Sequence, residues 1–405
     1  MRKILFVTYG GGHVNIIDEV AQSLLNIEEL EFNILALTLA YPKLRGIYPK
    51  GIVKNISDFS YLFEDLNEEA IYWGNYLLDE NYNINSSITK KETVHYIGYS
   101  YVDLILKHGK DRAAEIYHQK KRTSFLPTTI IEEIISKEGF DTIITTTSPR
   151  FELASIIAGN KLKKRTIQIL DLFGEIQPLP QAKEIITMNK DVTKSLIKQG
   201  VVSKFYEYGQ PSIEKTVHHV KSVESSVLKN KLRIKKKTIL VATQKLVEFT
   251  KNMTKGKVVD NKSIYKTLFK VVFKIVKDFN LQLLIRIHPS ENLSFYNDFL
   301  EGENYILLNN EFNSIESIAI SDYVLTHSST IGVEALACGK TVFTYSHHHG
   351  FYPIKQMQKE PFFHSNIIGL EKAIKKVLLC NEKNEKNEIF IPLGSVQKIK
   401  ELILN

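Results

Sequence analysis

His13 follows three glycines near the start of the chain and is the first residue whose position suggests chemistry. The segment reads MRKILFVTYGGGHVNIIDE. Ile4 to Val7 form a short apolar run, which indicates a buried parallel strand. Apolar residues then recur at helical spacing from Val14 to Leu25. The glycines therefore lie at a strand-to-helix turn, where backbone N–H groups can approach a ligand. His13 is either a polar residue that caps the helix start or a functional residue that acts as a general base or donates to a ligand.

Three short motifs in the second half combine imidazole, hydroxyl and carboxylate groups. They are Arg286-Ile-His288-Pro289, His327-Ser-Ser-Thr330 and Glu334. The Ser-Ser-Thr turn opens a helix, so its hydroxyls and the first N–H groups of that helix form an anion site. His288 or Arg286 can neutralise a phosphate leaving group. Glu334, one helical turn past Thr330, suits ribose hydroxyls. Ordinary N-capping and a solvent-facing carboxylate are the structural alternatives.

The elements that must position these residues alternate between strand-like and helical patterns. The strand-like runs cover residues 4–7, 32–39, 142–146, 165–170, 185–188, 206–211, 238–244, 281–288, 305–308, 322–329 and 340–344. Strand–helix–strand repetition predicts an α/β fold with two Rossmann-like, doubly wound domains. Because ligands bind at the carboxyl ends of parallel strands, we expect the two domains to face a central cleft.

The predicted domain boundaries follow breaks in this alternation. Residues 1–212 form an N-terminal domain with an aromatic-rich insert at 41–127, and residues 238–385 form a C-terminal domain. Residues 213–237 are predicted to be a polar linker, and residues 386–405 a C-terminal tail that is helical. Most aromatic residues of the insert are expected to fill a small core of their own. A minority suit an acceptor groove, because sugar faces pack on flat rings.

Composition limits the class of protein. A chain of 405 residues is too long for one ordinary core, which agrees with two domains. The net charge of +8 suits anionic ligands or peripheral contact with the inner membrane surface. The basic run 229–237 has no interleaved aromatics, so nucleic acid is not an expected partner. No apolar stretch reaches the roughly 20 residues that span a bilayer. With only Cys338 and Cys380, we expect a cytoplasmic protein.

The segments IRIHPSEN and SDYVLTHSSTIGVEALACGKTVFTY carry a family resemblance. They resemble the donor domain of GT-B glycosyltransferases that make bacterial surface polysaccharides. The HP and paired-hydroxyl motifs are most similar to those of capsule Kdo transferases, bacterial sialyltransferases and glycerophosphotransferases. In those families the motifs hold the phosphate of a cytidine nucleotide donor. The resemblance implicates His288, Ser328 and Ser329 in donor binding.

Two further segments resemble related enzymes. GGGHVNIIDEVAQSL is similar to the acceptor-domain opening of UDP-sugar glycosyltransferases, in which a histidine in this turn can act as base. The order TTSPR, ILDLFGE and YGQP resembles the first domain of non-hydrolysing UDP-GlcNAc 2-epimerases. The acidic triplet of sialyltransferases and the Ser-Gly-Gly turn of the epimerases are both missing from the sequence. These departures weaken two hypotheses, namely that the donor carries sialic acid and that the protein is an epimerase.

The resemblances imply a glycosyltransferase that moves a sugar from a CMP- or UDP-linked donor to a surface glycan or lipid-linked acceptor. The alternatives are a non-hydrolysing UDP-GlcNAc 2-epimerase-like enzyme and a non-catalytic basic binding protein. No cofactor is expected beyond the nucleotide-sugar co-substrate. No metal is expected, because no DxD motif ends a strand. Three consecutive histidines, His347 to His349, rarely all face one ion.

Direct displacement at the anomeric carbon needs a base for the acceptor hydroxyl and donors for the leaving phosphate. His13 is the first choice of base, because imidazole titrates near neutrality. Asp171 and Glu175 are the reserve candidates, and Asp18 is a candidate to orient His13. The remaining predicted site residues are Arg286, His288, Ser328, Ser329, Thr330, Glu334, Thr243 and Gln244 on the donor side, and Gly11, Gly12, Ser148 and Arg150 on the acceptor side.

Overall fold

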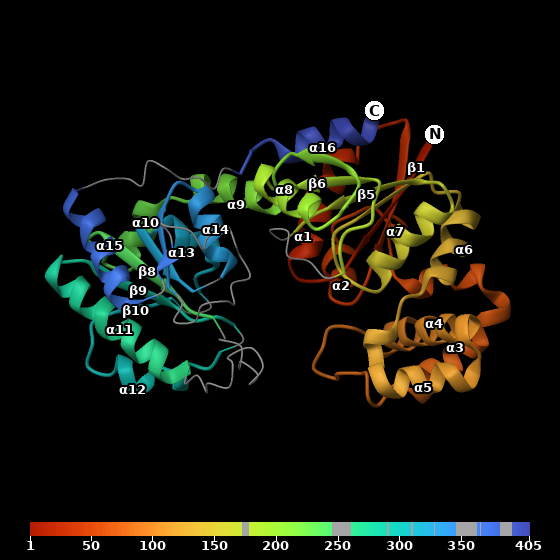
Figure 1. Ribbon diagram of the computed structural model, residues 1–405, viewed down its shortest axis with the longest axis horizontal. Helices are drawn as coiled ribbons and strands as arrows, with labels where there is room; N and C mark the ends of the chain where they lie inside the picture. Colours follow the sequence, from red (N-terminus) through yellow and green to blue (C-terminus); the bar gives the residue numbers. More distant parts are fainter. Residues whose placement is uncertain are drawn as a thin grey trace. The chain divides into compact units, whose positions relative to one another are not determined.

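The chain divides into two compact units, each built on one parallel sheet. The computed structural model describes residues 1–171, 178–244, 261–289, 291–308, 311–327, 329–345, 363–364, 366–380 and 391–405. The first unit comprises Met1–Ser212 together with Pro392–Asn405, and the second comprises Ile213–Ile391 (Figure 1). The predicted α/β fold class with two Rossmann-like sheets is confirmed.

The sheet of the first unit has seven parallel strands in the order β3-β2-β1-β4-β5-β6-β7. The strands are β1 (Arg2–Thr8), β2 (Leu30–Ala36), β3 (Val53–Lys54), β4 (Thr142–Thr145), β5 (Arg165–Ile169), β6 (Glu184–Thr187) and β7 (Lys204–Glu207). The chain first builds outward from β1 to β3 and then continues from β4 on the other side of β1. This reversal of strand order makes the carboxyl edge of β1 and β4 the expected ligand site of the unit.

Helices cover both faces of this sheet. They are α1 (Gly12–Leu24), α2 (Ala40–Leu44), η1 (Ile56–Leu62), α3 (Glu64–Tyr76), α4 (Lys90–His108), α5 (Lys110–Lys120), η2 (Lys121–Ser124), α6 (Thr128–Glu138), α7 (Phe151–Lys161), α8 (Lys190–Lys198) and α16 (Ser395–Leu404). Alternate residues of β1 serve the two faces. Ile4 and Phe6 pack in one core cluster with α1 and α16, whereas Leu5 and Val7 pack in the other with α4 and α6.

The C-terminal helix α16 belongs to the first unit although the rest of the second unit precedes it in the chain. Ile399 and Ile403 are fully buried beside α1. Arg2 Nη1 donates to the carbonyl of Ile403 (2.6 Å), and Arg165 Nη2 donates to the carbonyl of Leu402 (2.7 Å). Because these arginines lie on β1 and β5, both bonds fix the carboxyl end of α16 to the sheet.

The aromatic insert does not form a core of its own, contrary to the expectation. Tyr96, Tyr99 and Tyr101 of α4 belong to the same buried cluster as Leu5 and Val7 of β1. Helix α4 is buried along most of its length, with α3 packed against it (Figure 1). The insert therefore extends the core of the first unit outward from one face of the sheet.

Two glycines allow α3 and α4 to pack with their backbones in contact. A Cβ added at Gly98 would lie 1.9 Å from the Ala70 carbonyl oxygen, and one added at Gly74 would lie 2.0 Å from the Val94 carbonyl oxygen. These distances are far below van der Waals contact, and the atoms that a Cβ would meet are backbone atoms that cannot rotate away.

We expect Gly98→Ala to lower the free energy of unfolding by about 2 kcal/mol or more. Alanine normally favours a helix over glycine by about 1 kcal/mol, so a net loss reports the clash with α3. Urea unfolding followed by circular dichroism measures the effect. Gly46→Ala is the matched control, because an added Cβ there meets nothing within 4 Å. Equal stability of the two variants would contradict the close packing of α3 on α4.

The second unit has six parallel strands in the order β10-β9-β8-β11-β12-β13. The strands are β8 (Thr238–Ala242), β9 (Gln282–Arg286), β10 (Ile306–Leu307), β11 (Tyr323–Thr326), β12 (Thr341–Tyr345) and β13 (Phe363–His364). The helices are α9 (Pro211–Ser222), α10 (Ser225–Lys231), α11 (Asn261–Asp278), η3 (Leu293–Phe295), α12 (Asn297–Leu300), α13 (Ser314–Ala319), α14 (Thr330–Ala337) and α15 (Ile367–Cys380). Its core contains Tyr265, Phe269 and Tyr296, which are almost fully buried.

The segment predicted to be a polar linker, residues 213–237, differs from the expectation. It contains most of α9 and all of α10 and belongs to the second unit. Lys229 lies 3.5 Å from Asp322 Oδ2, and Lys231 Nζ lies 5.4 Å from the centre of the Phe312 ring. The start of the basic run therefore packs on the second unit instead of forming a solvated connection.

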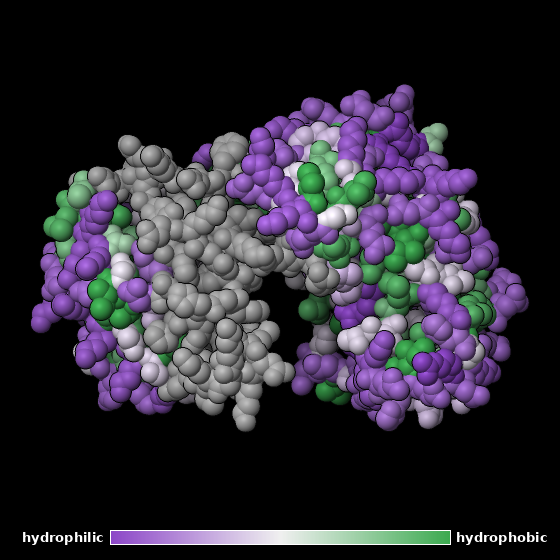
Figure 2. All heavy atoms as spheres, in the orientation of Figure 1, coloured by the Kyte–Doolittle hydropathy of each residue, from purple (hydrophilic) through white to green (hydrophobic). Residues whose placement is uncertain are grey.

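One side of the first unit can be judged for exposed apolar groups. The side of the first unit that Figure 2 displays is mostly hydrophilic, with small scattered hydrophobic groups. Among the helices that the structure describes, none combines the length and the apolar character needed to cross a bilayer.

Candidate active site

Three neighbouring strand ends in the first unit bring His13, Thr146 and Asp171 together. His13 lies in the first turn of α1, Thr146 directly follows β4, and Asp171 follows β5. His13 Nδ1 lies 2.6 Å from Thr146 Oγ1 and 3.3 Å from Asp171 Oδ2. The His13 side chain is 24% exposed, and no described residue bonds its Nε2. One ring nitrogen is therefore held by the protein while the other is available.

A buried carboxylate on α7 organises this group. Glu152 is fully buried, and its Oε2 accepts the Thr146 hydroxyl (2.6 Å) and the Ser148 N–H (3.0 Å). Its Oε1 accepts the Tyr9 N–H (3.1 Å). Burial raises the pKa of the Glu152 carboxyl, while His13 and these three donors favour its ionised form. A single side chain thus ties the turn after β1 to the turn after β4.

The hydrogen bonds of an ionised Glu152 favour one tautomer of His13. When Glu152 is ionised, the Thr146 hydroxyl donates its hydrogen bond to this carboxylate, so the Thr146 oxygen is left to accept. His13 Nδ1 must then be the donor in the 2.6 Å contact with Thr146. A neutral imidazole protonated at Nδ1 has its lone pair on Nε2. That form of His13 is the one that can accept a proton from a substrate.

Asp171 lies beside His13 and is held by contacts of its own. Its Oδ1 is bonded to the Thr147 hydroxyl, which leaves Oδ2 facing His13. The Gln210 side chain also donates to the Asp171 carbonyl (3.2 Å). Asp18, the candidate to orient His13, is buried instead and accepts from the Tyr48 hydroxyl (2.7 Å). The other reserve candidate, at position 175, lies outside the described residues.

The predicted acceptor-side residues surround the same turns. Gly11 caps α1 with φ +75°, and neither Gly11 nor Gly12 would place a Cβ within 4 Å of another atom. Ser148 contributes its N–H to Glu152. Arg150 has φ +71° and lies with its guanidinium carbon 5.5 Å from the centre of the Tyr9 ring. A left-handed conformation at arginine is uncommon, and such strain concentrates at ligand-binding turns.

The second unit brings Thr243 and His288 together at its own carboxyl edge. Strand β8 lies between β9 and β11, so the turns after all three strands are neighbours. The Thr243 hydroxyl accepts the His288 N–H (3.2 Å) and donates to Glu291 Oε2 (2.6 Å). The Gln244 N–H donates to the Tyr265 hydroxyl (3.0 Å). Sequence reasoning missed Glu291, although it lies in the same HPSEN segment as His288.

The start of α14 has hydrogen-bond donors that could bind a ligand. Ser329 occupies the N-cap position with extended backbone, and its side chain makes no capping hydrogen bond. Thr330, the first residue of α14, is exposed. The hydroxyl of Ser329 and the N–H groups at the start of the helix can therefore turn toward an anion. Ordinary N-capping does not account for Ser329, and the predicted partner at position 328 lies outside the described residues.

Arg286 and Glu334 have packing contacts in the structure. The guanidinium of Arg286 donates to the Phe312 carbonyl and lies 3.5 Å from Ser317 Oγ. Burial lowers the pKa of Arg286, and the nearby Glu316 and Glu334 oppose this shift. Burial also raises the pKa of Glu334, which Arg286 opposes. Glu334 is thus not the solvent-facing carboxylate of the structural alternative, and the predicted donor contacts of both residues remain predictions.

Metal-ligating side chains do not cluster in the described ranges. No three His, Cys, Asp or Glu residues among them are grouped in a way that could hold an ion. The consecutive histidines at 347–349 lie outside these ranges.

Comparison with known proteins identifies the fold. No established family profile matches the chain, and no curated protein matches its sequence. The UDP-GlcNAc 2-epimerase from Methanocaldococcus jannaschii aligns with a TM-score of 0.61 at 11% identity, over 100% of both chains. The UDP-GlcNAc 2-epimerase from Neisseria meningitidis bound to UDP-GlcNAc aligns with a TM-score of 0.59 at 14% identity, over 99% of both chains.

A polymerising enzyme also matches. The wall teichoic acid polymerase TagF aligns with a TM-score of 0.50 at 13% identity, over 100% of this chain and 88% of that one. None of these three structures is a capsule Kdo transferase or a sialyltransferase, so that finer resemblance remains a prediction. The chain has the GT-B type of fold, with two Rossmann-like units, that these nucleotide-sugar epimerases and the teichoic acid polymerase share.

Proposed function

We propose that this protein is a glycosyltransferase that uses a CMP- or UDP-linked sugar as donor and a glycan or lipid-linked glycan as acceptor. The state of His13 carries this proposal. Its Nδ1 is held by Thr146 and faces Asp171, and no described residue bonds its Nε2. A general base that is oriented by the protein and open on one side suits the removal of a proton from an acceptor hydroxyl.

In this mechanism the acceptor hydroxyl gives its proton to His13 Nε2 while its oxygen attacks the anomeric carbon. The bond from that carbon to the nucleotide phosphate breaks, and the phosphate leaves with the electron pair. The carboxylate of Asp171 stabilises the imidazolium that forms, from 3.3 Å away. We assign the leaving phosphate to His288, Ser329 and the N–H groups at the start of α14. No cofactor or metal is part of this proposal.

A UDP-GlcNAc 2-epimerase is the second candidate, because two of the reported structures of the same fold carry that name. The two functions differ in their need for an acceptor. Incubation with UDP-GlcNAc alone, followed by NMR, would reveal a 2-epimer if the protein is an epimerase. A transferase would instead release the nucleotide in proportion to added acceptor.

The donor site predicts specific losses of affinity. We expect His288→Ala and Ser329→Ala to weaken binding of the preferred nucleotide by roughly 1.5–3 kcal/mol, because each removes a donor to a charged phosphate. A thermal-shift panel with CMP, CDP and UDP first identifies that nucleotide, and calorimetry then compares the variants. His218→Ala and Ser226→Ala are matched controls, since both residues are exposed on α9 and α10. Parental affinity in both test variants would place the phosphate site elsewhere.

The non-catalytic alternative, a basic binding protein, can be tested with the same purified protein. Filter binding with labelled RNA and DNA at physiological salt measures nucleic acid binding. We expect no labelled nucleic acid to stay bound to the protein once the preferred nucleotide is added as competitor. Stable nucleic acid binding without any nucleotide response would favour this alternative over an enzyme. Co-sedimentation with anionic vesicles tests the proposed peripheral membrane contact.

A further inference from the structure

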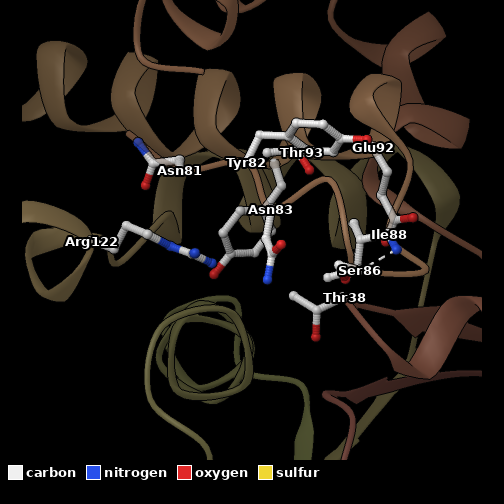
Figure 3. A pocket seen from close by; sticks show the side chains of 10 residues that line it. Thr38, Asn81, Tyr82, Asn83, Ser86, Ile88, Glu92, Thr93 and Arg122 are labelled. Carbon is white, nitrogen blue, oxygen red and sulfur yellow. Dashed lines mark hydrogen bonds between the residues drawn. The ribbon is translucent and has the colours of Figure 1, made fainter. Parts of the chain in front are cut away.

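The first unit contains a second site candidate, a cavity between the aromatic insert and the sheet edge. The cavity has a volume of about 240 Å³. It is lined by the turn after β2, the segment joining α3 to α4, the start of α4 and η2 (Figure 3). Ligand sites for drug-sized molecules usually occupy about 300–1,000 Å³. This cavity therefore suits a single sugar ring better than a whole nucleotide sugar.

Arg122 enters the cavity from one side without an anionic partner. Its Nε is buried and makes no hydrogen bond, and within the described part of the chain no carboxylate pairs with it. Its guanidinium carbon lies 5.4 Å from the centre of the Tyr96 ring. The preceding residue, Lys121, has φ +48°, a left-handed conformation that is uncommon outside glycine. Arg122 is partly exposed, but a buried guanidinium nitrogen normally has a hydrogen-bond acceptor beside it. The Nε of Arg122 therefore indicates an acceptor group on a ligand, and the positive charge of the guanidinium favours an anionic one.

Glu92 lines the opposite side of the cavity (Figure 3). It is 4% exposed, and its Oε1 is buried without a hydrogen-bond partner. Burial raises the pKa of Glu92 to about 7, with Arg45 opposing the shift. Near neutral pH this carboxyl can therefore accept from a ligand hydroxyl or donate to one. Thr38, which lines the same side, has φ +55°, a strained conformation for a β-branched residue.

We propose that this cavity binds an anionic sugar unit, with the carboxylate or phosphate of the sugar on Arg122 and a ring hydroxyl on Glu92. Asn83 and Ser86 lie between the two ends and supply further polar groups for hydroxyls. Tyr82 supplies an aromatic ring for an apolar sugar face. The assignment of this unit to the acceptor rests on the proposed transferase function, whereas the binding of an anionic sugar does not.

The cavity adjoins the turn that carries His13. The hydroxyls of Tyr96 and Tyr9 are 2.9 Å apart, and Tyr9 directly precedes the glycine turn. Gly10 packs against Leu39, since an added Cβ would lie 2.6 Å from the Leu39 Cβ. Leu39 in turn follows Thr38 of the cavity. An acceptor anchored in the cavity by its acidic unit would extend its other end along the sheet edge that holds His13.

Saturation-transfer NMR titration of the full-length protein, with no donor nucleotide present, tests the binding. The probes are methyl β-glucuronide, glucose 6-phosphate and the neutral methyl β-glucoside. We expect at least one acidic probe to bind at least tenfold more tightly than the glucoside. A preference for the carboxylate or for the phosphate then identifies the chemical source of the charge.

Variants locate the binding in the cavity. Arg122→Gln should lower affinity for the acidic probe roughly tenfold or more and reduce the preference over the glucoside to near one. Arg122→Lys should keep part of the preference and serves if Arg122→Gln does not fold. Glu92→Gln should weaken the binding of acidic and neutral probes alike. Arg112→Gln is the matched control, because Arg112 is exposed on α5 and pairs with Glu115.

The outcomes separate the cavity from the proposed function. An unchanged acidic preference in Arg122→Gln, or no binding of any probe to the parent protein, would overturn the cavity assignment. Transfer activity whose acceptor KM does not respond to Arg122→Gln would overturn the assignment of the bound sugar unit to the acceptor and leave the transferase function intact. Arg122-dependent binding in a protein without any transfer activity would support the cavity and contradict the proposed function.

Discussion

Replacing His13 with alanine is expected to lower turnover by roughly 10²- to 10⁴-fold while leaving nucleotide affinity nearly unchanged. The reason is that His13 has one ring nitrogen held by the protein, while no described residue bonds the other. Donor binding is assigned to the second unit, so the loss should fall on kcat. Steady-state kinetics with the identified donor and calorimetry with its nucleotide measure the two effects separately.

The alternative role for His13, a helix cap, makes a different prediction. Loss of a cap costs about 1 kcal/mol of stability and leaves turnover intact. The structure already argues against it, because Gly11 is the N-cap of α1 and no side chain caps the helix. Asp171→Asn serves as the companion variant and should give a smaller loss of kcat, since it only weakens the support of the imidazolium. Weaker donor binding with a modest rate loss in His13→Ala would instead show that His13 contacts the donor.

Sequence reasoning located the strand ends of the candidate site but not the side chains that connect them. His13 and Asp171 were predictable because each follows a buried strand of a parallel sheet. Their pairing was not, since it depends on β1, β4 and β5 being neighbours. Thr146 and Glu152 were missed because a buried threonine and a helix carboxylate resemble ordinary packing residues. Only the hydrogen bonds reveal that Glu152 fixes Thr146, which in turn fixes the imidazole.

In the fold as well, features that depend on local sequence patterns were predicted, and features that depend on tertiary contacts were not. Alternating strands and helices predicted both sheets except the two-residue edge strands β3 and β13, because buried parallel strands read as short apolar runs. The insert was interpreted as a separate core, since helical periodicity does not show that α4 lies between the sheet and α3. Gly74 and Gly98, which make that packing close, look like helix-weakening residues in the sequence. Residues 213–237 were assigned to a linker because short polar helices lack a long apolar face.

The second large effect is expected at Glu152. Glu152→Ala should lower the free energy of unfolding by about 3–5 kcal/mol, because three buried donors lose their acceptor at about 1–3 kcal/mol each before any rearrangement. Two of these donors are the N–H groups of Tyr9 and Ser148, which belong to turns that cannot move independently of the sheet. Denaturant unfolding measures the loss, and Glu133→Ala, at an exposed ion pair with Lys137, is the matched control.

The same substitution tests the link between stability and catalysis. Without Glu152 the Thr146 hydroxyl is free to donate to His13 Nδ1, which would favour the tautomer that has its proton on Nε2 and cannot act as base. Turnover of the folded fraction should therefore fall along with stability. Glu152→Gln keeps one acceptor oxygen and should retain more stability, yet it should still lose turnover because its amide cannot accept from all three donors. A Glu152→Gln enzyme with full kcat would separate Glu152 from the protonation state of His13 and leave it a purely structural residue.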